Sequence, residues 1–220
     1  MLIAFMNYFT KFTGWLPEQM VLRPKVLFEN KKVQRRRIKG AAIIISDHHS
    51  VYDYLAYMFV FFWRTLRFQM AEVLFKRKGL SRFLRALGGI YVDRDSHDFP
   101  CLTKSEAILR RGGVVGIFPE GTRNKENDEI LPFKAGSFKI ATKSGCDIIP
   151  ISIVNTSAIF EDNFPKIKKA HVIIEYGKPI PTAGLPREEL VALPGKSRDL
   201  IVEMYERNKS SLIPQNKKEV

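Results

Sequence analysis

Two side chains that could share a proton stand close together in this sequence. His48 and Asp53 are five positions apart. On a regular helix this spacing would separate them by about 140°, so they cannot meet as helix neighbours. They can meet if His48 lies in a loop and Asp53 lies in the first turn of the next helix. The carboxylate would then hold one imidazole nitrogen, while the other nitrogen acts as a general base.

The same residue types also have a purely structural interpretation. Ser50 or Asp53 could cap the helix, and His48 and His49 could be polar surface residues. The spacing alone leaves both interpretations open.

Two further segments place charged side chains directly after short apolar runs. Residues 88–94 end in Arg94, whose guanidinium suits a phosphate group, although an exposed ion pair with a neighbouring aspartate is an alternative. In residues 118–123, proline and glycine favour a fixed turn. Glu120 could accept a hydrogen bond from a substrate hydroxyl there, and Arg123 could hold a phosphate, but a turn without function is also possible. Pro150 stands inside an apolar run, which predicts an edge strand or a bulge.

The segments around these residues alternate between strand and helix patterns. Short apolar runs predict strands at residues 41–46, 67–70, 90–92, 114–118, 147–155 and 171–176. Longer patterns predict helices at residues 51–63, 72–87, 103–111 and 133–144, and from 186 onward with a break at residues 194–195. The helix at 103–111 opens with the capping-box spacing of Thr103 and Glu106. This alternation predicts an α/β fold with a mixed, largely parallel sheet flanked by helices and a site at the carboxyl ends of the strands.

Composition supports a folded domain with an anionic partner. The 220 residues are 45% apolar, which excludes intrinsic disorder, and they carry a net charge of +13. Such a charge suits lipid headgroups, a phosphorylated substrate or nucleic acid. Because no nucleic-acid-binding motif is present and the aromatic residues lie in apolar runs, we expect no nucleic acid partner.

The first 40 residues differ from the rest of the chain. Residues 1–22 are apolar and aromatic, but polar residues and Pro17 interrupt them too often for a membrane span. Six of the ten residues from 30 to 39 are Lys or Arg. We therefore predict a membrane-association segment at residues 1–40, an α/β domain at residues 41–220, and a location on the cytoplasmic face of an anionic membrane. A helix that docks on the protein, followed by a solvated charged loop, is the alternative.

The ordered series of these segments resembles the four motifs of the glycerolipid acyltransferase family, which includes the 1-acylglycerol-3-phosphate acyltransferases. The segments are His48-x4-Asp53, residues 89–94, Phe-Pro-Glu-Gly-Thr-Arg at residues 118–123, and Ile-Pro-Ile at residues 149–151. Residues 132–139 are also similar to the segment that follows the third motif. The resemblance covers residues 43–156, and four motifs in order are far more specific than one. It favours the functional interpretation of His48 and Asp53.

The resemblance implies transfer of a fatty acyl group from acyl-CoA or acyl carrier protein to the free hydroxyl of 1-acylglycerol-3-phosphate, giving phosphatidic acid. Transfer would be direct and would need no metal or other cofactor, with His48 as general base and Asp53 orienting it. The substrate-binding residues implied by the motifs are Arg94, Glu120, Gly121, Thr122, Arg123 and Pro150. Pro150 would help to shape the acyl or donor pocket, and the charged residues would hold the glycerol phosphate.

The sequence departs from the family pattern at two places. Asp47 stands where asparagine is more usual, and residues 68–72 lack the lysine that many members carry after the second strand. Phosphate binding therefore loses one expected cation, so the acceptor could be another lysophospholipid or a lyso-aminolipid. A non-catalytic basic protein that binds membrane or nucleic acid is a further, lower-ranked alternative.

Overall fold

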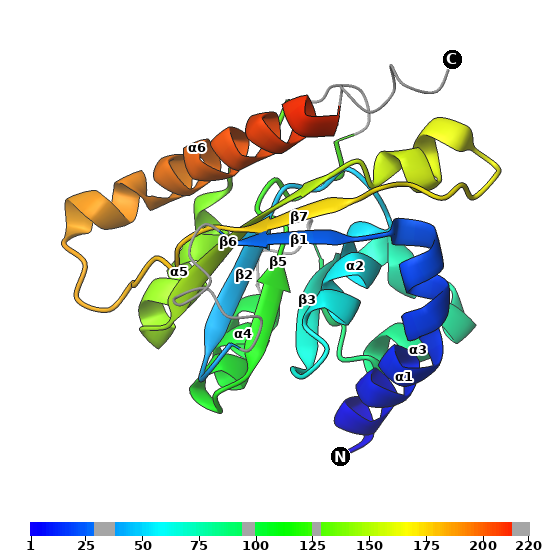
Figure 1. Cartoon of the computed structure of the whole chain (residues 1–220). Helices are drawn as coiled ribbons and strands as arrows, with labels where there is room; N and C mark the ends of the chain where they lie inside the picture. The colour runs from blue at the N-terminus through cyan, green and yellow to red at the C-terminus, as the bar shows by residue number, and fades with distance from the viewer. Residues whose placement is uncertain (29–37, 94–99, 125–128, 213–220) are drawn as a thin grey trace.

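A seven-stranded sheet runs through the middle of the protein (Figure 1). The computed structural model describes residues 1–28, 38–93, 100–124 and 129–212. The strands are β1 (Lys25–Phe28), β2 (Ala42–Ser46), β3 (Leu66–Ala71), β4 (Ile90–Val92), β5 (Val114–Ile117), β6 (Asp147–Val154) and β7 (Ile173–Tyr176). Their order across the sheet is β1-β7-β6-β2-β5-β3-β4. Among these strands, β6 and β7 pair antiparallel and the other neighbours pair parallel, which confirms the expected mixed, largely parallel sheet.

Helices cover both faces of the sheet. They are α1 (Leu2–Leu22), α2 (Asp53–Val60), α3 (Lys78–Ala86), α4 (Pro100–Arg110), α5 (Ala135–Ser144) and α6 (Arg187–Leu212), with short 3-10 turns at Glu72–Phe75 (η1), Ser157–Ile159 (η2) and Glu161–Asn163 (η3). In Figure 1, α1, α2 and α3 lie on one side of the sheet and α6 extends along the other. The expected helices on both faces are therefore confirmed.

The central strand β2 explains why both faces need cover. Its residues Ile43, Ile44 and Ile45 are at most 1% exposed. Ile44 packs into the apolar core beneath α2, while Ile43 and Ile45 pack into the second core beneath α4, α5 and α6. Consecutive side chains of a strand point to opposite faces, so a continuous apolar run requires a covered sheet on each side.

The N-terminal helix α1 is fixed to α2 and α3. Lys11 is fully buried, and its ammonium group donates hydrogen bonds to the carbonyl oxygens of Phe61 (3.0 Å), Phe62 (3.2 Å) and Arg64 (2.5 Å). These carbonyls lie at and beyond the end of α2, where a helix leaves acceptors without partners. Asn7 adds a bond of 2.6 Å to the carbonyl of Leu87.

The other side of α1 is apolar and exposed. Among the described residues, no helix has the length and apolarity that a membrane crossing requires. The large exposed apolar residues of α1 are Leu2, Phe5, Tyr8, Phe9, Phe12, Trp15, Leu16 and Met20. The predicted helical N-terminus is therefore present, and its association with a membrane stays a prediction. The basic residues at 31, 32 and 35–37 lie outside the described residues.

Three details of the expected elements were wrong. The helix expected at residues 72–87 is divided into η1 and α3. α4 begins at Pro100, so Thr103 lies inside the helix instead of capping it, and Glu106 forms an ion pair with Arg110 at 2.7 Å. α6 continues through Pro194 without the expected break. Buried residues on both sides of that proline, including Leu193 and Ile201, pack into the core, and this packing outweighs the lost backbone hydrogen bond.

Pro150 does not lie in an edge strand. β6 lies between β2 and β7, and Pro150 is opposite Ile45 of β2. On the side of β7, the regular pairing begins only at Ile151. Beyond β7, the N–H of Gly177 donates to the carbonyl of Pro150 at 2.9 Å, and the next contact is an isolated bridge between Ile148 and Ile180. Proline has no backbone N–H to donate. At Pro150 this donor would fall outside the regular pairing of β6 with β7, which is why an interior strand tolerates this proline.

Candidate active site

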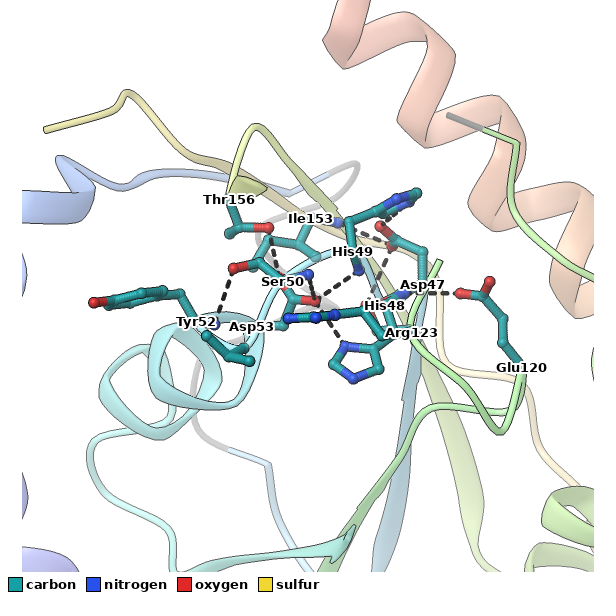
Figure 2. A network of polar contacts seen from close by, with 12 residues as sticks. Asp47, His48, His49, Ser50, Tyr52, Asp53, Glu120, Arg123, Ile153 and Thr156 are labelled. Carbon is teal, nitrogen blue, oxygen red and sulfur yellow. Dashed lines mark hydrogen bonds and ion pairs between the residues drawn. The ribbon is translucent and has the colours of Figure 1, made fainter. Parts of the chain in front are cut away.

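His48 and Asp53 meet in the turn between β2 and α2. The Nδ1 atom of His48 lies 2.9 Å from Oδ2 of Asp53. β2 ends at Ser46 and α2 begins at Asp53, so His48 lies in the loop and Asp53 in the first helical turn. The chain thus folds back in the way that the functional interpretation of the spacing requires. Figure 2 shows the two side chains directed toward each other.

The carboxylate of Asp53 is completely buried and held by several donors. Its Oδ2 accepts hydrogen bonds from the backbone N–H groups of His49 and Ser50, both at 2.9 Å. Its Oδ1 accepts one from the hydroxyl of Thr156 at 2.5 Å. These bonds offset the cost of burying a carboxylate and fix its orientation. Asp53 is therefore suited to hold the imidazole in one position.

The imidazole of His48 is also fixed from its face. The ring of Phe118 stacks on it with a centroid distance of 4.0 Å and an interplanar angle of 13°. The side chain of His48 is 22% exposed, whereas Asp53 is buried. With a proton on Nδ1 in the bond to Asp53, Nε2 is the nitrogen available as a base. The pair can thus take a proton from a group that enters the site.

Glu120 ties the turn after β5 to the histidine loop. Its Oε1 accepts the backbone N–H of His48 at 2.8 Å, and its Oε2 accepts that of Leu131 at 3.0 Å. The carbonyl of His48 accepts the N–H of Asn124 at 2.9 Å, so both backbone groups of the histidine are engaged. Burial raises the pKa of Glu120 to about 7, although both backbone hydrogen bonds oppose this shift. This geometry indicates that Glu120 positions His48, a role that sequence reasoning did not assign to it.

Arg123 is held by an acidic residue from a distant part of the chain. Its Nη1 lies 2.7 Å from Oε1 of Glu161, which is in η3. Glu161 also accepts hydrogen bonds from the hydroxyl of Ser50 at 2.7 Å and from the N–H of Val51 at 2.9 Å. The loop after β2, the turn after β5 and the segment after β6 therefore meet at one carboxylate.

Asp47 and His49 lie on the opposite side of the loop from the His48 imidazole (Figure 2). Oδ1 of Asp47 accepts the N–H of Ile153 at 3.1 Å, and its Oδ2 lies 3.5 Å from Nε2 of His49. The ring of His49 stacks on Tyr205 of α6 at 5.2 Å. Burial, and to a smaller extent the nearby Asp53, raises the pKa of Asp47 well above its usual value. Asp47 thus fastens the loop to β6.

The remaining predicted residues are placed as follows. Gly121 has a positive φ of 72°, and an added Cβ would lie 2.7 Å from the ammonium nitrogen of Lys134, so the turn favours glycine. Thr122 is exposed in the same turn, and Pro150 is buried in β6 beside β2. Arg94 lies outside the described residues. Substrate contact by any of these residues stays a prediction.

Thr156 and Glu161 were missed by sequence reasoning. Thr156 follows β6 as His48 follows β2 and Glu120 follows β5, and these three strands are adjacent in the sheet. The rule that carboxyl ends of parallel strands share one edge could have found Thr156. Glu161 lies in the short 3-10 turn η3 rather than at a strand end, and it gave no such signal. Among the described residues, no group of three or more His, Cys, Asp or Glu side chains could hold a metal ion.

Comparison with known proteins agrees with this architecture. The family model described as Acyltransferase matches residues 25–154. Human 1-acyl-sn-glycerol-3-phosphate acyltransferase beta is 27% identical over 184 residues, which cover 82% of this chain and 65% of that protein. A 1-acyl-sn-glycerol-3-phosphate acyltransferase from Borreliella burgdorferi is 31% identical over 173 residues, which cover 76% of this chain and 67% of that protein. The chain therefore aligns with about two thirds of the length of these relatives.

A solved structure has the same fold. The crystal structure of the 1-acyl-sn-glycerophosphate acyltransferase PlsC from Thermotoga maritima superposes with a TM-score of 0.66 and 24% sequence identity. The superposition covers 96% of this chain and 79% of that chain. The family match extends over more than half of the chain and includes His48, Asp53, Glu120 and Arg123. The chain belongs to the acyltransferase family.

Proposed function

We propose that this protein transfers a fatty acyl group from a thioester donor, acyl-CoA or acyl carrier protein, to the free hydroxyl of 1-acylglycerol-3-phosphate. The observation that carries the proposal is the His48–Asp53 pair, 2.9 Å apart in the loop after β2. Membership of the acyltransferase family and the names of the two relatives described above support the reaction class and the acceptor.

The proposed step is a direct displacement. The acceptor oxygen forms a bond to the thioester carbonyl carbon while Nε2 of His48 takes the hydroxyl proton. The C–S bond then breaks, and the imidazolium returns the proton to the departing thiolate. Asp53 keeps the imidazole oriented and stabilises its positive charge. The cysteines Cys101 and Cys146 are both buried, outside the motif loops, so the sequence offers no thiol nucleophile at the site.

We propose a supporting role for the turn at residues 118–123. Arg123 would hold the acceptor phosphate, because its guanidinium has five N–H donors and its ion pair with Glu161 is made through Nη1. Arg94 would add a second guanidinium. Glu120 would act through the backbone of His48, since both of its carboxylate oxygens accept backbone hydrogen bonds.

We also propose that α1 rests on the cytoplasmic face of an anionic membrane. Its exposed aromatic residues could enter the interface, and the buried ammonium of Lys11 holds the helix on the domain. The basic residues between positions 30 and 39 would contact anionic headgroups. Sedimentation with vesicles tests this: Phe12→Glu should reduce binding to anionic vesicles by at least tenfold. Unchanged binding would contradict the proposal.

The test of the reaction offers labelled acyl-CoA and acyl-loaded carrier protein to the purified protein on anionic vesicles. The acceptors are lysophosphatidate, other lysophospholipids and a lyso-aminolipid. We expect labelled phosphatidic acid, and a loss of activity of at least 100-fold in His48→Ala, since general base catalysis contributes about 10²–10⁴-fold. His171→Ala changes an exposed histidine away from the site and is the matched control. Product in His48→Ala above a few per cent of the unmodified protein would overturn the mechanism.

A further inference from the structure

Glu161 connects the loop that holds His48 with the turn that holds Arg123. One carboxylate oxygen, Oε1, accepts from Nη1 of Arg123 at 2.7 Å and from the N–H of Val51 at 2.9 Å. The other, Oε2, accepts from the hydroxyl of Ser50 at 2.7 Å. Ser50 and Val51 lie between His48 and Asp53 in the sequence, and Arg123 is the guanidinium proposed for the acceptor phosphate. Glu161 therefore contacts both the catalytic loop and the phosphate-binding turn.

The contacts are strong enough to fix these parts. The side chains of Arg123 and Glu161 are 27% and 20% exposed, so their ion pair is shielded from much of the solvent. Hydrogen bonds to a charged acceptor are shorter and stronger than neutral ones. The hydroxyl of Ser50 is itself used twice, because it also accepts the N–H of Tyr52 at 3.0 Å, just before α2. The carboxylate thus contacts the loop directly at two residues, Ser50 and Val51, and reaches Tyr52 through the hydroxyl of Ser50.

We propose that Glu161 is a positioning residue for the acceptor: it orients the Arg123 guanidinium and holds it at a constant distance from the His48 loop. Its carboxylate occupies one nitrogen of the guanidinium and leaves the other N–H donors for a phosphate. An acceptor whose phosphate is bound at Arg123 then presents its hydroxyl to His48 at a fixed spacing, which is the geometric condition for fast transfer. This inference rests on the proposed function and adds a residue that lies beyond the four motifs.

The kinetic test compares Glu161→Gln with Asp162→Asn. Both substitutions remove one negative charge from η3, but Asp162 is exposed, and its carboxylate accepts the hydroxyl of Ser157 at 2.9 Å within η2 and η3 instead of contacting the loop after β2. For Glu161→Gln we expect the KM for lysophosphatidate to rise about tenfold, with the donor KM within twofold of the unmodified protein. Asp162→Asn should leave both KM values within twofold. If Glu161 served only to stabilise the fold, Glu161→Gln would not change the acceptor KM and the donor KM by different factors.

A double substitution tests whether Glu161 acts through Arg123. In the background of Arg123→Ala, Glu161→Gln should change the acceptor KM by less than twofold, because the group that it positions is gone. A tenfold effect that persists in this background would overturn the inference. So would an acceptor KM that falls in Glu161→Gln, because the carboxylate would then compete with the phosphate for Arg123.

A second readout needs no turnover. Hydrogen–deuterium exchange of a peptide covering residues 48–54 should be at least fivefold faster in Glu161→Ala than in Asp162→Ala, since the N–H of Val51 loses its acceptor. Equal exchange in the two variants would overturn the holding role, whatever the kinetics. If the unmodified protein acylates no acceptor, the proposed function and the acceptor role of Glu161 both fail, and the exchange result still decides whether the carboxylate holds the loop.

Discussion

Thr156, in the segment after β6, donates its hydroxyl hydrogen bond to Oδ1 of Asp53 at 2.5 Å. The two residues are 103 positions apart in the chain. Both side chains are buried, so the contact lies behind the imidazole and out of reach of solvent. The carboxylate that contacts His48 is thus itself held by a residue at a neighbouring strand end, and the proposed catalytic pair extends to a third residue.

Thr156→Val should lower kcat about tenfold and leave both KM values unchanged. The substitution keeps the side-chain shape but leaves Oδ1 of Asp53 without its hydroxyl donor, at a cost of about 1–3 kcal/mol for an unsatisfied buried acceptor. Steady-state kinetics and a thermal melt measure the two effects. Thr156→Ser is the matched control, because it keeps the hydroxyl and should retain most of the activity. Equal activity in the valine and serine variants would contradict this role.

Glu120→Gln should reduce kcat by about tenfold to 100-fold without unfolding the protein. The carboxylate accepts from two backbone N–H groups, whereas a glutamine amide would direct its NH₂ group against one of them. Repulsion between this NH₂ group and the backbone N–H would shift the backbone of His48. Glu129→Gln, at an exposed glutamate in the same region, is the control and should remain near full activity. We would abandon the positioning role if the two variants had similar kcat values.

Asp47→Asn should stabilise the protein increasingly as pH rises above about 4. Burial raises the pKa of Asp47 above the usual value of about 3.9, which it has in the unfolded chain. Between these two pKa values the folded state binds more protons, so the stability that this group contributes is complete at low pH and is lost as pH rises. This loss of unfolding free energy is about 1.4 kcal/mol for each unit by which the folded-state pKa exceeds the unfolded one, and asparagine, which does not titrate, removes it.

Urea unfolding of the Asp47→Asn variant at pH 4.5, 6 and 8 measures this difference. The gap in unfolding free energy between the variant and the unmodified protein should be larger at pH 8 than at pH 4.5. Asp147→Asn, at the exposed first residue of β6, should show no such trend. A gap that stays constant across this pH range would show that Asp47 keeps its charge in the folded protein.

Arg94→Ala should raise the KM for lysophosphatidate at least tenfold more than the KM for the donor. The expectation comes from the position of Arg94 in the second motif, after the strand at 90–92. Kinetics with each substrate varied in turn measure the two values. An acceptor without a phosphate should be insensitive to the substitution, and equal effects on acceptor and donor would argue against phosphate binding.

Patterns within the chain predicted the sheet, and together with the family resemblance they favoured a contact between His48 and Asp53. The apolar run at 41–46 predicted a strand, and the observed strand is 42–46. The positions of His48 and Asp53 on either side of a helix start allowed a contact, which the motif resemblance favoured and the structure contains. Both features depend on residues that are close in sequence. Local periodicity is sufficient for the strand, whereas the choice between the two interpretations of His48 and Asp53 also needed the order of the four motifs.

Features that depend on distant residues could not be read in this way. The strand β1 was missed, because its pattern is four residues long and its pairing partner β7 lies far along the chain. The interior position of Pro150 depends on the pairing of β6 with β7. The contacts of Glu161 join segments more than 35 residues apart. Tertiary contacts decide these features, and local propensity does not contain them.

The path of the N-terminal chain has a consequence for how this protein can be produced. The end of α1 and the chain after it form hydrogen bonds with the segment that leads into β7: the carbonyls of Val21 and Leu22 accept from the N–H groups of Ala170 and Val172, and β1 then pairs with β7. A shortened protein that begins at residue 41 would expose the backbone of β7 and the apolar face under α1. Expression of residues 41–220 alone should therefore give aggregates rather than a minimal enzyme.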